Sequence, residues 1–209
     1  MAFLDGPGDL FAKSNFIKRV HMKTQQPDQF DDVAFRKSLS SEQAFDHRTQ
    51  KGMQPVIDIA GYPYYLNVRW NILEPRLIIG EMKVRPTIHL DKDCFYDDQT
   101  DKFVLYYDTK RQEPFDVPTG ITTLPKNVVF VKIPNTYEAD PVGMAREDGK
   151  SDPRYYLEKF PIQLHHTAEI IELKNSPLMD EIKANKAKQS QHRSPRRRVD
   201  PGPQGKKKS

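Results

Sequence analysis

The chain has 209 residues, and its hydrophobic content of 36% with a mean hydropathy of −0.77 is low for one domain that fills the whole length. No apolar run reaches the ~18 residues that a membrane-spanning helix needs, and the apolar run at the N-terminus is too short for a signal peptide. We therefore expect a protein that has no membrane partner.

Charge is divided unevenly along the chain. Residues 183–209 hold ten Lys or Arg against one acid, Asp200, so this tail carries +9. The whole chain carries +4, which leaves −5 for residues 1–182. Attraction to polyanions is therefore expected in the tail, whereas the rest of the chain would repel them.

Cys94 is the only cysteine, so the chain cannot form an internal disulfide bond. A reducing compartment suits such a chain, and we expect a cytoplasmic protein. Cys94 follows Asp93 in an acidic stretch, which would raise the pKa of the thiol and disfavour a nucleophilic role.

Residues 1–54 form a polar lead-in. Apolar residues have rough helical spacing over 10–20 and 33–39, and a polar run around Pro27 separates the two stretches. Few hydrophobic side chains are available there to offset the entropy lost on ordering. We expect the lead-in to be weakly structured, with helices that form only against a partner.

The stretch 55–69 predicts the hairpin around which the domain is organised. Its second arm alternates apolar and polar residues, with Leu66 and Trp70 on one face, and this period of two indicates a half-buried strand. Gly61 and Pro63 are the expected turn residues, because glycine accepts a positive φ and proline fixes φ near about −65°.

More strands are predicted downstream of this hairpin. Residues 87–90 read as a short strand, and 94–96 with 102–108 read as a second hairpin. Both faces of the arm at 102–108 carry bulky side chains, which predicts a central strand. A loop is expected over the proline-rich stretch 113–126, and the most regular strand pattern in the chain follows at 128–133.

The C-terminal third predicts short helices around a last strand. Asp140, Asp152 and Ser176 each precede a proline, a pairing that places a capping side chain before proline at the first helical position. Gly149 is expected to end the first of these helices. A strand is predicted over 163–173, between the second helix and the third.

Together these elements predict an α+β fold. Its sheet is mainly antiparallel and built from hairpins, with a few short helices toward the C-terminus and disordered segments at both ends. The predicted domains are the lead-in at 1–54, the core domain at 55–182 and the basic tail at 183–209.

Several core segments resemble a group of uncharacterised bacterial conserved hypothetical proteins. The resemblance covers rather over half of the chain and implies a shared fold, but no activity, cofactor or site residue. The segments that carry it are Ile-Ala-Gly-Tyr-Pro-Tyr-Tyr-Leu-Asn-Val-Arg (59–69), Asp-Pro-Val-Gly-Met-Ala-Arg (140–146), and residues 106–110, 124–126 and 161–165.

Catalytic motifs are absent from the sequence. His165 and His166 are adjacent on a predicted strand, so they point to opposite faces and cannot chelate one ion together; His166 is expected to be a hydrogen-bonded core histidine. Asp91 and Asp93 resemble a metal-holding acidic pair, but no phosphate-binding glycine loop accompanies them, and turn chemistry is favoured. We therefore predict no catalytic residue, no metal and no cofactor.

Aromatic residues and arginines gather along the first hairpin. Such neighbours can stack bases, although they can equally fill a core. The candidate binding face consists of Tyr62, Tyr64, Tyr65, Arg69 and Trp70.

The basic tail carries the most specific functional signal. Its prolines, glycines and like charges disfavour a packed structure, and cations that neutralise phosphates bind nucleic acid without reading its sequence. A solubilising extension is the alternative interpretation. The candidate nucleic-acid contacts are Arg193, Arg196, Arg197, Arg198, Lys206, Lys207 and Lys208.

These features favour a non-enzymatic binding module. Its core domain would hold a protein partner, and its tail would give sequence-independent nucleic-acid binding. Two alternatives stay open: an enzyme with a site assembled around His165, Asp91 and Asp93, and a plain protein-interaction module with a solubilising tail.

Overall fold

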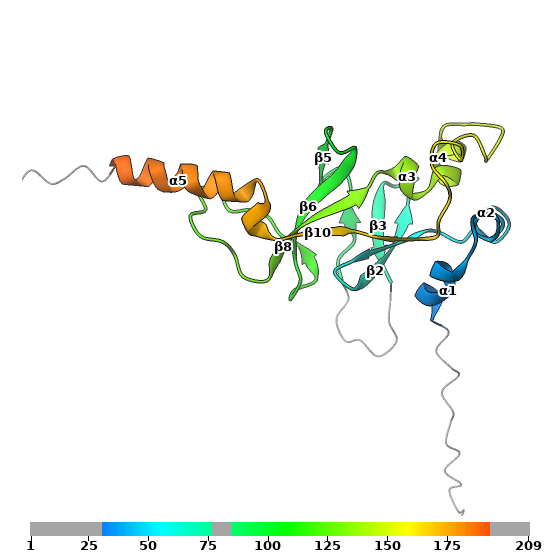
Figure 1. Cartoon of the computed structure of the whole chain (residues 1–209), viewed down its shortest axis with the longest axis horizontal. Coiled ribbons are helices and arrows are strands. Elements are labelled where there is room, and N and C mark those ends of the chain that lie inside the picture. Colours follow the sequence, from blue (N-terminus) through cyan, green and yellow to red (C-terminus); the bar gives the residue numbers. More distant parts are fainter. Residues whose placement is uncertain (1–30, 77–84, 193–209) are drawn as a thin grey trace, which may run out of the picture. The chain divides into compact units, whose positions relative to one another are not determined.

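The computed structural model describes residues 31–76 and 85–192, which form two β-sheets that share one hydrophobic core (Figure 1). Of the strand pairings within these residues, all but one are antiparallel. The predicted α+β class, with mainly antiparallel strands built from hairpins and a few short helices, is confirmed. None of the described helices is both long and apolar enough to span a bilayer.

Each of the two sheets has five strands. The first sheet runs β4 (Ile88–His89), β3 (Ile72–Pro75), β2 (Tyr62–Asn67), β1 (Val56–Ile59), β9 (His165–Thr167). The second runs β10 (Glu169–Ile171), β8 (Val128–Pro134), β6 (Lys102–Asp108), β5 (Phe95–Asp97), with β7 (Glu113–Pro114) also paired to β6. The predicted central position of the strand at 102–108 is therefore confirmed.

The first hairpin turns more tightly than predicted. Ile59 pairs with Tyr62, so only Ala60 and Gly61 form the turn, with φ of 54° and 87°. A two-residue turn with both φ positive matches the right-handed twist of its strands, and Asp58 accepts a 2.7 Å hydrogen bond from the Gly61 amide. Pro63, predicted in the turn, lies inside β2.

The second arm of this hairpin is shorter than its sequence pattern predicts. β2 ends at Asn67, and the chain turns toward β3 with Asn71 at a φ of 51°. Trp70 therefore lies in a turn and is 67% exposed, whereas Leu66 is buried. The prediction that these two side chains share a face is wrong.

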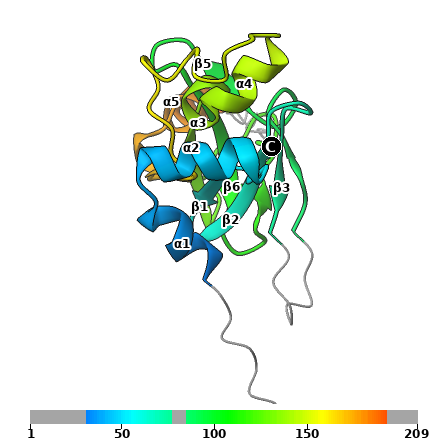
Figure 2. The same ribbon diagram turned by 90° about the vertical axis from the view of Figure 1, so that its right-hand side faces the viewer.

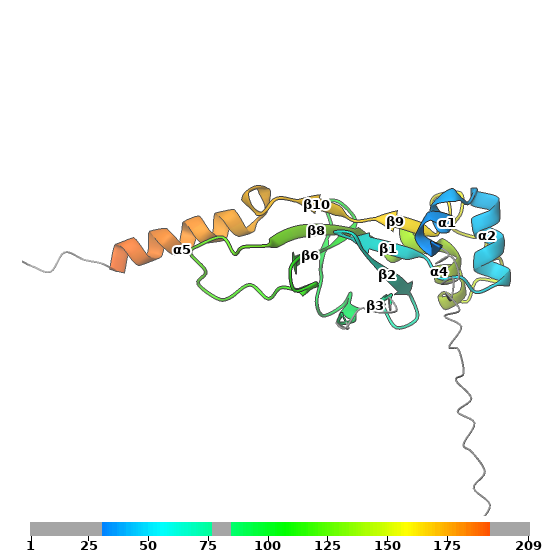
Figure 3. The same cartoon turned by 90° about the horizontal axis from the view of Figure 1, so that it is seen from below.

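One continuous segment passes from the first sheet to the second. β9 pairs in parallel with β1, and β10 pairs antiparallel with β8. Buried Ala168 lies between them, and its amide donates to the Asp58 carbonyl at 2.8 Å. Figure 3 shows β9 and β10 in line. The predicted single strand over 163–173 is thus two three-residue strands in different sheets.

Two helices precede the sheets and correct the predicted lead-in. α1 (Asp32–Ser38) and α2 (Ser41–Gln50) are capped by Asp31 and by Ser40, the latter in a capping box. Phe45 of α2 is buried in a cluster with residues from the C-terminal half. The expectation of a weakly structured segment is therefore wrong for residues 31–54, and the helical spacing over 33–39 corresponds to α1. Residues 1–30 lie outside the described residues.

The C-terminal helices follow two of the three predicted starts. α3 (Thr136–Ala139) precedes α4 (Pro141–Glu147), which Asp140 caps and Gly149 follows at a φ of 66°. Residues 153–159 form consecutive turns closed by local bonds, not the predicted helix. The 3₁₀ helix η1 (Leu173–Asn175) leads into α5 (Leu178–His192), so a helix occupies the start of the predicted disordered tail.

The helices gather at two ends of the sheets. Figure 2 shows α1, α2 and α4 together on one side. α5 lies at the opposite end and extends away from the strands (Figures 1 and 3). The shared core between the sheets includes Ile57, Leu66, Leu105 and Ile133, all essentially inaccessible to solvent.

Candidate binding groove

The second sheet has one face toward the shared core and one face turned outward. On β6, Leu105 and Tyr107 belong to the shared core, whereas Val104 and Tyr106 alternate with them and face outward. The first turns of α5 pack on this outer face through Leu178 and Ile182. The same helix leaves the neighbouring part of the face uncovered.

The uncovered part is a groove with a volume of about 520 Å³. Val104, Tyr106 and Phe130 lie on the sheet beneath it, and five separate segments contribute side chains. We call this surface the groove throughout. Its lining residues are Lys92, Asp93, Phe95, Val104, Tyr106, Pro114, Phe115, Asp116, Val117, Phe130, Pro177 and Glu181.

Phe95 is the most exposed aromatic residue of the groove. It lies on the edge strand β5, pairs with Val104 of β6 and is 70% exposed. Phe115, just after β7, is held in place by the bond from its amide to the Tyr106 carbonyl at 2.8 Å. A large apolar ring exposed beside a hollow apolar surface is typical of an interaction site.

The polar lining of the groove is mainly acidic. Asp93, Asp116 and Glu181 come from three different segments, and Lys92 is the one cation among the lining residues. Asp93 accepts a 2.7 Å hydrogen bond from the His89 amide, which fixes its carboxylate. Asp116 and Glu181 are exposed and form no ion pair among the described residues.

Two titratable groups near the groove are held in their neutral forms. Burial raises the pKa of the Cys94 thiol to about 12, and the carboxylates of Asp93 and Asp91 add to the effect. The predicted direction of this shift is confirmed. Burial also raises the pKa of Tyr106, against the opposing effect of hydrogen bonds with Ser176 and the Leu178 backbone.

The candidate aromatic face on the first hairpin does not form one surface. Tyr64 is fully buried, and its hydroxyl lies 2.9 Å from the Tyr107 hydroxyl; burial raises the pKa of Tyr64. Tyr65 points to the other side of β2, where Arg36 lies 5.4 Å from its ring and Asp32 accepts from its hydroxyl. The alternation of side chains along a strand, already visible in the sequence, separates these neighbours.

The remaining members of that face lie at the two ends of β2. Tyr62 is half-buried, and the guanidinium of Arg85 stacks 5.3 Å from its ring centroid. Arg69 stacks over Trp70 at 5.6 Å in the turn that follows β2. These two clusters are separate cation–π pairs and no common stacking platform.

The residues of the enzyme alternative are not brought together in the groove. Asp93 lines it, but His165 does not. His165 is buried on β9, and its Nε2 has no hydrogen-bond partner among the residues that the structure describes. The His166 Nε2 lies 3.1 Å from the Ala139 carbonyl, as predicted for a hydrogen-bonded histidine. No group of three His, Cys, Asp or Glu side chains in the described part of the chain can hold a metal ion.

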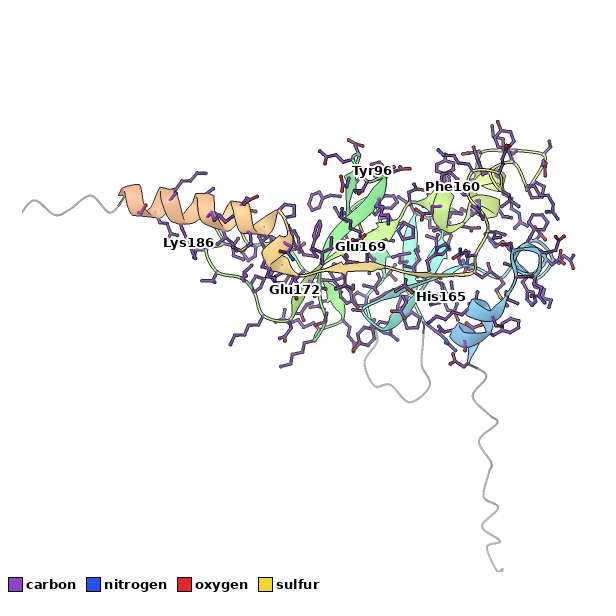
Figure 4. The ribbon with its side chains drawn as sticks, viewed as in Figure 1. Tyr96, Phe160, His165, Glu169, Glu172 and Lys186 are labelled. Carbon is purple, nitrogen blue, oxygen red and sulfur yellow. The ribbon has the colours of Figure 1, made fainter. Side chains whose placement is uncertain are left out.

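The candidate nucleic-acid contacts from Arg193 to Lys208 lie outside the described residues. The helix that leads to them is already basic, with exposed Lys183, Lys186 and Lys188 on α5. Figure 4 shows Lys186 on the part of α5 that extends beyond the strands, away from His165. Cations therefore begin on a helix whose first turns pack on the second sheet through Leu178 and Ile182.

Sequence reasoning missed the groove. Phe115 and Val117 lie in the stretch that the sequence predicts only as a loop, and Phe95 lies in a predicted hairpin with no predicted binding role. An apolar pair inside a proline-rich loop was the available signal, because exposed loops rarely carry Phe and Val without a surface to contact. No protein-family model, curated protein or solved structure matches this chain.

Proposed function

We propose that the protein is a non-enzymatic binding module whose core domain holds a protein partner in the groove. The observation that carries this proposal is Phe95, an aromatic ring left 70% exposed at the edge of a hollow apolar surface. Soluble domains seldom leave such a surface open unless a partner covers it. The lone cysteine supports a reducing, cytoplasmic location as part of the proposal.

The size of the groove limits how much it can contribute to the free energy of binding. Burying one Leu-, Phe- or Met-sized side chain there is worth about 1.5–3 kcal/mol, or about tenfold to more than a hundredfold in Kd. Hot spots of protein interfaces have this scale and sit in well-packed pockets. One anchor residue in the groove therefore suffices to dominate a moderate affinity.

A pair of matched substitutions tests the proposal. Phe95→Asp places a charge in the groove, and Trp70→Asp does the same to an aromatic side chain of almost equal exposure, 67%, outside it. Pull-downs from the native cell should recover the partner with wild type and Trp70→Asp and lose it with Phe95→Asp. Equal recovery by all three proteins would show that the groove is not the binding surface.

We further propose that the basic tail gives sequence-independent binding to nucleic acid. Ten Lys or Arg against one acid in residues 183–209 support it, and so do the three lysines exposed on α5. Deletion of 193–209 should greatly weaken binding to any single strand or duplex while the melting temperature stays unchanged. In the full chain, the logarithm of affinity should fall with the logarithm of salt concentration with a slope of about −4 to −6.

The outcome of this deletion separates the alternatives. If neither form binds nucleic acid, the tail is a solubilising extension of a plain interaction module. The enzyme alternative predicts that His165→Ala or Asp91→Asn abolishes the biological activity of a protein that remains folded. Retained activity in both folded variants is the expected result, because neither side chain lines the groove.

A further inference from the structure

The groove has a net charge as well as a shape. Three carboxylates and one ammonium group line it, so its side chains carry a net charge of −2. Asp93 is already bound to the His89 amide, and the exposed carboxylates of Asp116 and Glu181 have no cation paired with them in the described residues. Two acceptors are thus available on the loop after β7 and on α5.

The segment that contributes Lys92, Asp93 and Phe95 to the groove carries an excess of acidic residues. The segment from residue 91 to residue 101, which contains β5, holds Asp91, Asp93, Asp97, Asp98 and Asp101 against the single Lys92. Of these, Asp97 is paired with Lys132 at 3.4 Å. Carboxylates beside an apolar floor attract cations and repel polyanions, with a strength that depends on salt.

We propose that the partner segment is a cationic peptide with one bulky apolar side chain. The apolar side chain rests on Val104, Tyr106 and Phe130, and flanking Lys or Arg residues meet Asp116 and Glu181. This inference rests on the proposed function, because it names the chemistry of the partner that the groove would hold. It also predicts that nucleic acid on the tail and peptide in the groove do not compete for one site.

The basic tail of the chain lacks the bulky apolar side chain that the proposed peptide needs. Residues 193–209 contain no aromatic residue, Leu, Ile or Met, and Val199 is their one β-branched apolar residue. They supply cations without the anchor that would fill an aromatic groove of about 520 Å³. The basic tail therefore does not match the peptide that we propose for the groove.

Fluorescence anisotropy with three labelled peptides tests the inference on the full-length protein. The first peptide has a central Trp between pairs of Lys, the second replaces Trp by Ala, and the third replaces Lys by Glu. We expect binding of the first, with at least about tenfold weaker binding of the second. The third should not enter the groove, and any signal from it should persist in groove variants because it reports the basic tail.

A double charge reversal supplies the matched control. Asp116→Lys with Glu181→Lys changes two exposed groove acids, and Glu147→Lys with Glu158→Lys makes the same change in net charge outside it. The groove pair should weaken the Lys–Trp peptide by at least about tenfold, and the outside pair by no more than about twofold. Equal weakening by both pairs would overturn the inference, because it would report net charge alone.

The remaining outcomes separate the inference from the proposed function. If no peptide binds but the cellular partner is still lost with Phe95→Asp, the groove binds a partner of another chemistry and only the inference fails. If no peptide binds and Phe95→Asp recovers the partner normally, the groove is not the binding surface and both fail.

Discussion

Two regions of the molecule each combine apolar side chains with carboxylates, but one region is covered and the other is open to solvent. At the α2–α4 junction, formed by Phe45, Arg48, Asp140 and Val142, apolar side chains meet and are covered. At the groove, aromatic side chains meet and stay open. The charged groups of the two regions differ in the same way. Asp140 is fully buried and lies 2.7 Å from Arg48. Glu181 is exposed and has no partner cation among the described residues.

This difference in burial and pairing distinguishes a contact that stabilises the fold from a surface that is open to a partner. At the junction each group has its complement within the chain: Asp140 accepts from the Arg48 guanidinium and from the Gly143 amide. A fully satisfied buried cluster holds elements in place. At the groove the apolar floor stays open, and the carboxylates of Asp116 and Glu181 have no paired cation among the described residues; the proposed partner would supply both complements. The following predictions test this contrast, beginning with the largest effect.

Asp140→Ala should be the most damaging of these substitutions. It leaves the Arg48 guanidinium, 10% exposed, without its carboxylate and removes the cap of α4. Breaking a buried ion pair costs about 3–5 kcal/mol of unfolding free energy. Urea titration measures this, with Asp140→Asn as a milder variant should Asp140→Ala not fold.

An exposed pair is the control for this experiment. Lys102 and Glu169 lie 4.0 Å apart at the surface of the second sheet, and Lys102→Ala should cost no more than about 1 kcal/mol. A similar loss for both variants would show that the junction is no more structural than the surface around it.

Gly143→Ala should destabilise the same junction despite improving helix propensity. A Cβ at this position would lie 2.6 Å from Cγ of Asp140 and 2.8 Å from a methyl carbon of Val68. The gain of about 1 kcal/mol from replacing glycine in a helix is outweighed by overpacking of about 1–3 kcal/mol, so we expect a net loss. Thermal unfolding should rank Gly143→Ser below Gly143→Ala; a stabilised Gly143→Ala would show that Asp140 can move aside.

Acid should weaken the domain through the two adjacent histidines on β9. Burial lowers the pKa of His165 and of His166 below the ordinary value of 6.5, and at His166 the bond with the Ala139 carbonyl acts in the opposite direction. Because the unfolded chain binds these protons more readily, stability is fully present above about pH 6.5 and falls as the pH drops toward the lower folded pKa values.

Unfolding curves at successive pH values measure this effect. His165→Gln and His166→Gln should each flatten the fall in stability between neutral and mildly acidic pH. A pH dependence that is unchanged in both variants would assign the acid sensitivity to carboxylates instead.

The smallest expected effect on stability belongs to the groove. Phe95→Asp and Trp70→Asp replace side chains that are 70% and 67% exposed, so each should change the unfolding free energy by no more than about 0.5 kcal/mol. Denaturant titration of both variants checks this. A loss above about 2 kcal/mol for Phe95→Asp alone would mean that its ring stabilises the fold, which would remove the contrast with the junction.

Local patterns in the sequence determined most of the secondary structure. The hairpin at residues 94–108, the strand at 128–133 and the helix that begins after Asp140 and ends before Gly149 are all present. Each depends on neighbours a few residues apart: alternating side chains, a capping carboxylate, a proline and a glycine. Such signals act on the backbone locally and do not depend on distant parts of the chain.

The tertiary structure alone decided which distant residues meet. Arg48 and Asp140 are 92 positions apart. The local caps that start α1 and α2 do not reveal that Phe45 packs in one cluster with Val142 and Leu164. The passage of the last strand between sheets at Ala168 and the gathering of Phe95, Phe115 and Phe130 around the groove are of the same kind. The physical reason is that local signals set the conformation of a segment, whereas the path of the chain through space sets its neighbours.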